Sequence, residues 1–361
     1  MINLQTSDLR IREARHLSPP VVLLNKYPLR DEGSGFVLKS RQTIADIVTG
    51  KDSRLLVIAG PCSIHDPQAA IEYARRLHEL ALNYPDELFV VMRVYFEKPR
   101  TVVGWKGLIN DPGVDGSFAI NEGLEIARKL LVEITDLKVP AATEFLDTII
   151  GQFIADLISW GAVGARTTES QIHRDLASGL SMPVAFKNGT DGDIQVAIDA
   201  VRAARTPQWF PSITREGVAA ILATKGNEWG HIVLRGGSKS GPNFEAAAVT
   251  EAVSLLEKSG LPPYLMIDCS HGNSFKDHLK QISVAAAVSQ QIAAGNRAIC
   301  GVMLESHLVA GKQKYTDKAS ACYGLSITDA CISIEQTAEI FAELAAAVKS
   351  RRELSPIQDN D

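Results

Sequence analysis

A group of cationic side chains follows one apolar segment of the sequence. Residues 88–96 contain valine, methionine, tyrosine and phenylalanine without a breaker, which predicts a buried strand. Lys98, Arg100 and Thr101 come directly after it, and Pro99 stiffens the chain between them because its ring fixes φ. Cations and a hydroxyl at the end of a strand suit a phosphate group. A solvated basic loop is the alternative that these residues alone leave open.

Cationic residues also end three later apolar segments. Arg166, Lys187 and Arg235 are each followed by small residues that form hydrogen bonds, glycine and threonine among them. Glycine lets the backbone approach an anion, and arginine offers two parallel donors to phosphate oxygens. Together with Arg93 and Lys98, these cations are too many for one phosphate. The sequence therefore predicts two anionic groups, which fits a phosphorylated carboxylate among the substrates.

A repeat of strand, loop and helix must position these residues. Continuous apolar runs, rather than alternating ones, indicate a parallel sheet that is covered on both faces. The fold class is therefore α/β, as a single (β/α)8 barrel of the TIM type, with a doubly wound open sheet as the alternative. The predicted strands are 55–59, 88–96, 139–143, 162–166, 183–187, 231–235, 264–269 and 298–304. The predicted helices between them include 66–81, 120–135, 147–160, 191–204, 245–258 and 277–294.

Three parts of the chain differ from this repeat. Residues 1–50 are polar and irregular, with one helix predicted at 40–49, and we interpret them as an N-terminal arm. Residues 51–352 are predicted to form the catalytic barrel. Within it, residues 209–230 alternate apolar and small polar types, which predicts an inserted β-hairpin before the sixth strand. Residues 353–361 are predicted to be a flexible tail.

The composition excludes several classes of function. The chain has 361 residues, of which 45% are hydrophobic and 22% charged, enough to bury a large core. A net charge of −5 and a pI near 5.9 argue against nucleic acid as a partner. No apolar run reaches membrane-spanning length, and the first 20 residues lack the apolar centre of a secretory signal. Five cysteines without the spacing of a disulfide scaffold fit a reducing cytoplasm.

Barrel enzymes carry their chemistry at the carboxyl ends of the strands. Each predicted strand here ends at or near a reactive side chain, which chance would rarely produce. These side chains are Cys62, Arg93, Glu144, Arg166, Lys187, Arg235, Asp268 with His271, and Glu305.

Cys62, His271 and Glu305 belong to the first, seventh and eighth predicted strands, which are neighbours once the barrel closes, and Asp329 follows soon after. A thiolate, an imidazole and two carboxylates suit Zn²⁺, Fe²⁺, Co²⁺ or Mn²⁺ better than Ca²⁺ or Mg²⁺. Each residue also has a structural explanation, since a cysteine commonly packs as a hydrophobe and an aspartate can cap a helix. Their positions on neighbouring strands of the closed barrel favour a site for one divalent metal ion. Cys331 should bring its thiol near Cys62, so that oxidation without metal would join the two.

The motifs together resemble a known family. They look like those of 3-deoxy-D-arabino-heptulosonate 7-phosphate (DAHP) synthase of the type I, feedback-regulated class, from Asp8 to about Arg352. The stretches that carry the resemblance are Gly60-Pro-Cys-Ser-Ile-His-Asp66, Arg93-Val-Tyr-Phe-Glu-Lys-Pro-Arg-Thr-Val-Val-Gly-Trp-Lys-Gly-Leu-Ile109, Gly164-Ala-Arg-Thr-Thr-Glu-Ser170, Phe186-Lys-Asn-Gly-Thr-Asp-Gly192, Leu234-Arg-Gly-Gly237, Asp268-Cys-Ser-His-Gly-Asn273, Glu305-Ser-His307 and Thr328-Asp-Ala-Cys331.

The resemblance implies the first step of the shikimate pathway, in which phosphoenolpyruvate and D-erythrose 4-phosphate condense to DAHP and phosphate. The residues it assigns to the divalent metal ion (Mn, Co, Fe or Zn) are Cys62, His271, Glu305 and Asp329. Those it assigns to the substrates are Arg93, Lys98, Glu144, Ala165, Arg166, Lys187 and Arg235 for phosphoenolpyruvate, Arg100 and Thr101 for the erythrose phosphate, with His271 and Asp329 beside them. The metal would polarise the aldehyde. Lys98, Glu144 and His271 are the candidates for handling the proton of the water that adds.

Two other functions are weighed against this one. 3-Deoxy-8-phosphooctulonate synthase uses arabinose 5-phosphate on the same barrel, but the stretch Lys98-Pro-Arg-Thr101 argues against it. A non-catalytic sensor of aromatic amino acids is disfavoured because the metal and phosphate residues are all present.

The resemblance also implies feedback inhibition by an aromatic amino acid at a subunit contact of a homodimer or homotetramer, which makes residues 1–50 and the hairpin the regulatory parts. The family's usual Pro-Gln is Gly151-Gln152 here, which frees volume, and residues 151–160 resemble the tryptophan-sensitive branch. We therefore expect tryptophan as the inhibitor, with phenylalanine next. The residues that would line the effector cavity are Asp8, Thr148, Gly151, Gln152, Leu176, Leu180, Ser181, Phe210, Ser212 and Leu222.

Overall fold

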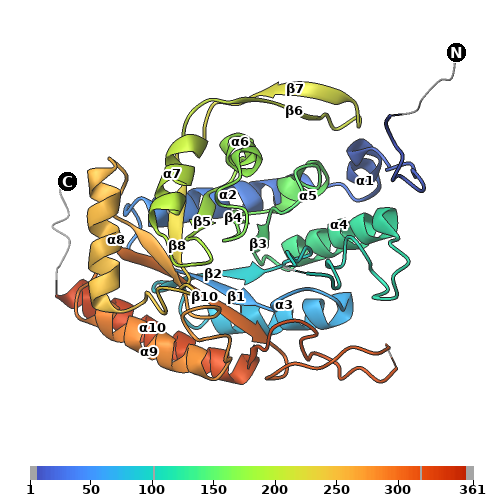
Figure 1. The fold of residues 1–361 in the computed structure, drawn as a ribbon. Coiled ribbons are helices and arrows are strands. Elements are labelled where there is room, and N and C mark those ends of the chain that lie inside the picture. Colours follow the sequence, from blue (N-terminus) through green and yellow to red (C-terminus); the bar gives the residue numbers. More distant parts are fainter. Residues whose placement is uncertain (1–5, 101, 318, 355–361) are drawn as a thin grey trace, which may run out of the picture.

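Eight parallel strands close into a barrel in the computed structural model of the chain, which describes residues 6–100, 102–317 and 319–354 (Figure 1). In order around the barrel they are β1 (Leu55–Gly60), β2 (Leu88–Arg93), β3 (Ala141–Glu144), β4 (Trp160–Val163), β5 (Val184–Lys187), β8 (His231–Leu234), β9 (Leu265–Asp268) and β10 (Ile299–His307). Strand β10 pairs back with β1, where Leu56 lies beside Gly301 and Gly60 beside Glu305. This pairing confirms the predicted barrel and excludes the open sheet.

Helices cover the outside of the barrel. They are α3 (Pro67–Ala81), α4 (Ile120–Asp136), α5 (Gly151–Ile154) with the 3-10 turn η1 (Ala155–Leu157), α6 (Gln171–Gly179), α7 (Gln195–Ala204), α8 (Ala246–Lys258), α9 (Lys280–Ala293) and α10 (Ile334–Glu353). Two of these helices begin at side chains that cap the helix N-terminus. Asp66 accepts hydrogen bonds from the backbone of Gln68 and Ala69 at the start of α3, and Ser333 forms a capping box with Gln336 at the start of α10.

The strands bury side chains on both faces. In β1, Leu55 and Val57 belong to the core between the sheet and the helices, whereas Leu56 and Ile58 belong to the core inside the barrel. This double burial explains why the strands appear in the sequence as continuous apolar runs.

Two helices precede the barrel, α1 (Pro20–Lys26) and α2 (Asp31–Val48). Helix α2 begins at Asp31 and not at Ser40 as predicted, and it places Ile44, Ile47 and Val48 in the core inside the barrel. Residues 31–48 are therefore part of the packing of the barrel, which restricts the predicted arm to the residues before them.

The predicted hairpin is present. Strands β6 (Trp209–Ile213) and β7 (Ala219–Ala223) pair antiparallel, with Phe210 beside Leu222, and lie above α6 at the edge of the molecule (Figure 1). The backbone N–H of Val21 donates to the carbonyl of Arg215 at 2.8 Å, so the start of α1 contacts the hairpin.

Some predicted bounds are wrong. The helix expected at 147–160 is only α5 and η1, because the backbone of Ser159 already donates to Ala141 and β4 begins at Trp160. The strand expected at 88–96 ends at Arg93, although the three residues after it remain buried. Of the helices within the described ranges, none combines the length and apolarity that crossing a bilayer requires.

Candidate active site

A cavity of about 770 Å³ opens where the carboxyl ends of the strands meet. The structure brings together ten of the residues predicted to contact substrates, and Thr101 lies outside the described residues. The ten that line the cavity are Arg93, Lys98, Arg100, Glu144, Ala165, Arg166, Lys187, Arg235, His271 and Asp329. The cavity is therefore strongly cationic, and two of the metal-ligand candidates, His271 and Asp329, belong to its lining.

Arg93 forms the deep end of this cavity. Its guanidinium is buried, donates to the carbonyls of Pro61 and Cys62 at 3.1 and 3.2 Å, and lies 3.2 Å from Glu305 Oε1. The ring of Tyr95 lies 3.5 Å from the guanidinium carbon, a cation–π contact. These contacts hold the planar guanidinium in one orientation before any substrate binds.

Lys98 lies beside Cys62, one of the predicted metal ligands. Its ammonium donates to the carbonyl of Cys62 at 2.9 Å and lies 3.1 Å from the Cys62 sulfur. Burial opposes the charge of Lys98, but the nearby sulfur and the Glu305 carboxylate together raise its pKa above the ordinary value. Lys98 is therefore a cation at neutral pH and a donor at the floor of the cavity.

Three of the four predicted metal ligands gather closely. One ligand atom each of Cys62, Glu305 and Asp329 lies within 4.8 Å of the others, and His271 Nε2 is 3.7 Å from Glu305 Oε1. Ligand atoms around one tetrahedral ion lie roughly 3.5 Å apart, given bond lengths of about 2.0–2.3 Å. The four side chains therefore fit a divalent ion after small movements.

His271 is oriented as a metal-binding histidine would be. Its Nδ1 lies 2.9 Å from Asp268 Oδ2 and 2.7 Å from Ser270 Oγ, so that Nε2 is left to face Glu305. A carboxylate on the far nitrogen of a ligating histidine is common in metal sites because it fixes the tautomer. His271 also has a φ of 53°, a strained value for a non-glycine residue.

Asp268 connects two residues of the cavity lining. It is fully buried, and its Oδ2 accepts from Lys187 Nζ at 2.8 Å as well as contacting His271. Burial alone would raise the pKa of Asp268, but His271 and Lys187 hold it well below its usual range. The sequence identified Asp268 only as a strand end, whereas the structure gives it the role of fixing Lys187 and His271.

Arg166 and Arg235 are two further guanidiniums in the lining of the cavity. Burial lowers the pKa of Arg235, Asp268 opposes this, and the nearby charge of Arg166 lowers the pKa further. Two like charges that line one cavity are stabilised when an anion lies between them.

Sequence reasoning missed Thr190, Ser238 and Lys276, which line the same cavity. The first two follow Lys187 and Arg235 in glycine-rich stretches, a signal that could have found them.

Comparison with known proteins decides the family. The profile of the DAHP synthetase I family matches residues 29–342. The chain belongs to the DAHP synthetase I family. This confirms the resemblance seen in the sequence motifs, and the chain is an enzyme of the DAHP synthase type.

The relatives match nearly the whole length of the chain. It is similar to the Phe-sensitive phospho-2-dehydro-3-deoxyheptonate aldolase of Escherichia coli (strain K12), at 58% identity over 97% of this chain and 100% of that protein. It is also similar to the Trp-sensitive form from Buchnera aphidicola subsp. Acyrthosiphon pisum, at 53% identity over 96% of this chain and 99% of that one. A solved phospho-2-dehydro-3-deoxyheptonate aldolase from Francisella tularensis SCHU S4 matches with a TM-score of 0.93 and 52% identity, over 95% of this chain and 99% of that chain.

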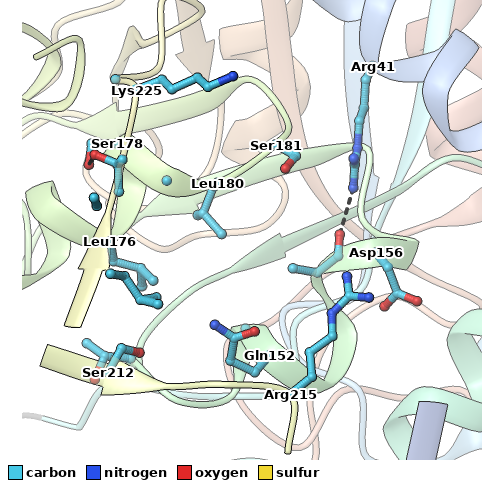
Figure 2. Close-up of a pocket in the computed structure, with 18 of the residues that line it drawn as sticks. Arg41, Gln152, Asp156, Leu176, Ser178, Leu180, Ser181, Ser212, Arg215 and Lys225 are labelled. Carbon is cyan, nitrogen blue, oxygen red and sulfur yellow. Dashed lines mark hydrogen bonds between the residues drawn. The ribbon is translucent and has the colours of Figure 1, made fainter. Parts of the chain in front are cut away.

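The structure has a second cavity, of about 690 Å³, which is lined by elements outside the eight barrel strands (Figure 2). It lies between α2, the α5 region, α6 and the hairpin, and Asp8 is not among the residues that line it. The nine predicted effector residues that do line it are Thr148, Gly151, Gln152, Leu176, Leu180, Ser181, Phe210, Ser212 and Leu222.

Charged side chains line the second cavity as well, and sequence reasoning missed them. Figure 2 shows Arg41, Asp156 and Arg215 on the side of Gln152, and Lys225 on the opposite side. Arg41 donates to the carbonyls of Ala155 and Ile158 at 2.7 and 2.9 Å, and burial lowers its pKa to about 10. A cavity with apolar walls and both signs of charge suits a small zwitterion with an apolar side chain.

Proposed function

We propose that the chain condenses phosphoenolpyruvate with D-erythrose 4-phosphate to give DAHP and inorganic phosphate, the first step of the shikimate pathway. The observation that carries the proposal is the cavity that cations from four strands line together with His271 and Asp329, two of the predicted metal ligands. Arg93, Lys98, Arg166, Lys187 and Arg235 bind phosphoenolpyruvate, beside Ala165. Arg100 and Thr101 bind the phosphate of the aldehyde.

A divalent ion held by Cys62, His271, Glu305 and Asp329 would act as a Lewis acid on the aldehyde carbonyl. Carbon 3 of phosphoenolpyruvate forms a bond to that carbonyl carbon, water adds to carbon 2, and phosphate leaves with cleavage of the C–O bond. Lys98 donates a hydrogen bond to the aldehyde oxygen as negative charge develops there, because its ammonium lies at the floor of the cavity beside Cys62.

Glu144 takes the proton of the attacking water. Its Oε1 is buried at the cavity wall without a hydrogen-bond partner, and a side chain at Gly164 would collide with it. A buried carboxylate oxygen without a partner is costly, so a water molecule that bonds to it relieves that cost and is held where it can react.

The test is an assay of product and phosphate release with erythrose 4-phosphate and, separately, arabinose 5-phosphate. We expect turnover with the first sugar and little with the second, as the relatives' names for the seven-carbon product suggest. Turnover with arabinose 5-phosphate alone would favour 3-deoxy-8-phosphooctulonate synthase instead.

A second experiment tests the metal requirement. Exhaustive chelation should abolish turnover, and Mn²⁺, Co²⁺, Fe²⁺ or Zn²⁺ should restore it. Full activity with verified metal removal would refute the metal requirement.

We also propose feedback inhibition through the second cavity by an aromatic amino acid. Gly151 leaves room for a large ring and favours tryptophan, whereas the higher overall identity to a Phe-sensitive relative favours phenylalanine. We retain tryptophan because Gly151 lies in the cavity itself. Each of the three aromatic amino acids, added alone at equal concentration, should separate these possibilities, and insensitivity to all three would refute the proposal.

Two further expectations belong to this function. The hairpin exposes Trp209 and Ile221, which fits a subunit contact in a homodimer or homotetramer. The unpaired cysteines fit a reducing cytoplasm. Light scattering at several concentrations tests the first expectation, and a monomer at all of them would contradict it.

A further inference from the structure

Three buried asparagines lie next to residues of the substrate cavity, although none of them is among the described residues that line it. They are Asn188, Asn243 and Asn273, which are between 0% and 6% exposed. They follow strands β5, β8 and β9, each in the loop at the carboxyl end of its strand. A buried amide has to find its hydrogen-bond partners within the protein, so the partners of these side chains show what they hold in place.

The backbone of Arg235 and Gly236 takes up most of these hydrogen bonds. The N–H of Arg235 donates to Asn188 Oδ1, and the N–H of Gly236 donates to Asn243 Oδ1, both at 2.7 Å. The carbonyl of Gly236 accepts from Asn188 Nδ2 at 3.2 Å, and the carbonyl of Arg235 accepts from the backbone N–H of Asn273 at 3.1 Å. Both N–H groups and both carbonyls of this pair are therefore bound by one of the three asparagines.

The asparagines also bind one another and the ends of the strands. Asn243 Nδ2 donates to Asn188 Oδ1 at 3.3 Å, and the backbone N–H of Asn243 donates to Asn273 Oδ1 at 2.8 Å. Asn273 Nδ2 donates to the carbonyls of Leu234 and Asp268 at 3.1 and 2.8 Å. These bonds connect the loops after β5, β8 and β9 at the point where the pairing of the three strands ends.

The glycines beside Arg235 serve this packing of the loops and not the binding of an anion by the backbone. Gly236 has a φ of 71°, and a Cβ there would lie 2.5 Å from the carbonyl carbon of Gly272. The N–H of Gly236 is bound to an asparagine, and the N–H of Gly237 donates to the carbonyl of Gly241 at 2.8 Å. The guanidinium of Arg235 is therefore the group of this stretch that can donate to an anion, and its direction decides how well it does so.

We propose that the three asparagines are positioning residues for an anionic group of phosphoenolpyruvate. They fix the backbone of Arg235 and Gly236, and thereby the direction from which the guanidinium meets the anion. Arg235 Nη1 donates to the carbonyl of Gly236 at 3.2 Å, so the guanidinium contacts the backbone that the asparagines hold. Arginine binds an anion through parallel N–H groups in one plane, which makes the contact sensitive to small rotations. The inference rests on the proposed function, which assigns Arg235 to phosphoenolpyruvate.

The experiment compares Asn243→Ala with Asn227→Ala in the full-length enzyme, assayed with the same divalent ion and without aromatic amino acids. Asn227 is the matched control, because its side chain is 5% exposed and donates to three backbone carbonyls at 2.9–3.2 Å. It precedes β8 and so lies at the end of the barrel opposite the substrate cavity. Both changes remove a buried amide and should lower the urea concentration at half-unfolding, whereas only Asn243→Ala releases the backbone of Arg235.

We expect Asn243→Ala to raise the KM for phosphoenolpyruvate at least about tenfold, with kcat and the KM for erythrose 4-phosphate within about threefold of the wild type. The reason is that the guanidinium is still present and only its direction is lost. Calorimetry should show weaker binding of inorganic phosphate to this variant. Asn227→Ala should keep the three kinetic constants and the affinity for phosphate.

A second variant, Asn243→Ser, provides the test if Asn243→Ala does not fold. Its hydroxyl is too short to replace both contacts of the amide, so the KM for phosphoenolpyruvate should rise in the same selective way, but less. Lower stability of the folded variants without a change in this KM would show that the asparagines are structural only. An equal rise in both KM values, or a lower kcat with unchanged KM values, would also overturn the positioning role.

The binding of inorganic phosphate separates this inference from the proposed function. If the wild-type enzyme does not turn over phosphoenolpyruvate, the proposed function fails, and calorimetry with phosphate still decides the role of the asparagines. Weaker binding to Asn243→Ala than to the wild type and Asn227→Ala supports that role. Equal affinity of all three proteins, or no binding to any of them, overturns it.

Discussion

The backbone N–H of Cys62 donates to the sulfur of Cys331 at 3.4 Å, across 269 positions of sequence. Cys331 comes directly before β11 (Ile332–Ser333), which pairs with the end of β10 where Glu305 lies. The sequence predicted that these two thiols would meet, and the structure places both fully buried beside the ligand cluster. Cys62 is one of the predicted metal ligands, so a bond between the two sulfurs would remove a ligand.

Oxidation of the metal-free enzyme should therefore join Cys62 to Cys331 and prevent added metal from restoring activity, whereas reductant followed by metal should restore it. Peptide mapping after mild peroxide treatment should find this pair, and bound metal should slow its formation. Cys331→Ser should keep activity in reducing buffer and resist peroxide, whereas Cys322→Ser, a change of an exposed cysteine, should behave like the wild type. Equal peroxide sensitivity of Cys331→Ser and the wild type would rule out this pair as the cause.

Asp268→Asn should destabilise the fold as well as reduce activity. The change leaves Lys187 buried without its counter-charge, which costs about 3 kcal/mol or more in the free energy of unfolding. Asp191→Asn is the matched control, because the contact of Asp191 with Lys239 is exposed and should contribute less than about 1 kcal/mol. Urea unfolding measures both. Similar losses for the two variants would show that the buried pair contributes no more than a surface pair.

The ionisation of Glu97 should make stability depend on pH. Its pKa is about 8 in the folded protein and near its ordinary value of 4.5 when unfolded, so the folded state binds the extra proton between these values. This contribution is complete below about pH 4.5 and is lost as the pH rises through 8. The difference in unfolding free energy between the wild type and Glu97→Gln should therefore change steadily from pH 5 to 8. A difference that is constant across this range would contradict the buried, protonated carboxyl.

Much of the barrel could be predicted because its information is local. The strand runs, the proline at the start of α3 and the alternation in the hairpin each depend on residues close in sequence. Closure of the barrel is different, because β1 and β10 are paired by residues such as Leu56 and Gly301 that have no common local pattern. The count of strands favoured closure without proving it.

The same distinction applies to the candidate sites. Cations that follow strands are visible in the sequence, and Arg166 lines the cavity although β4 already ends at Val163. Glu97 left no signal, because its partners are backbone N–H groups, which every residue has. Asp156 was also missed, because its partner Arg128, at 2.8 and 2.9 Å, belongs to a different helix and the pairing leaves no local signal in the sequence.

Gly151→Ala tests the choice of effector. The added methyl carbon would lie 3.6 Å from the ring of Phe145, an ordinary contact, and Gly151 starts α5 without a positive φ. The variant should therefore fold and gain about 0.4–1 kcal/mol in unfolding free energy, because alanine restricts the unfolded chain. Its methyl group narrows the second cavity and should weaken inhibition by tryptophan more than inhibition by the smaller phenylalanine.

Gly35→Ala is the control, since Gly35 lies exposed in α2, its added carbon meets nothing within 4 Å, and it does not line the cavity. It should gain stability of the same order, as alanine is the better helix former, without any change in inhibition. Inhibition curves for the three amino acids on both variants supply the measurement. If tryptophan inhibits neither the wild type nor Gly151→Ala while phenylalanine inhibits both, the volume left by Gly151 does not select the effector, and the whole-chain similarity to the Phe-sensitive relative is the better guide.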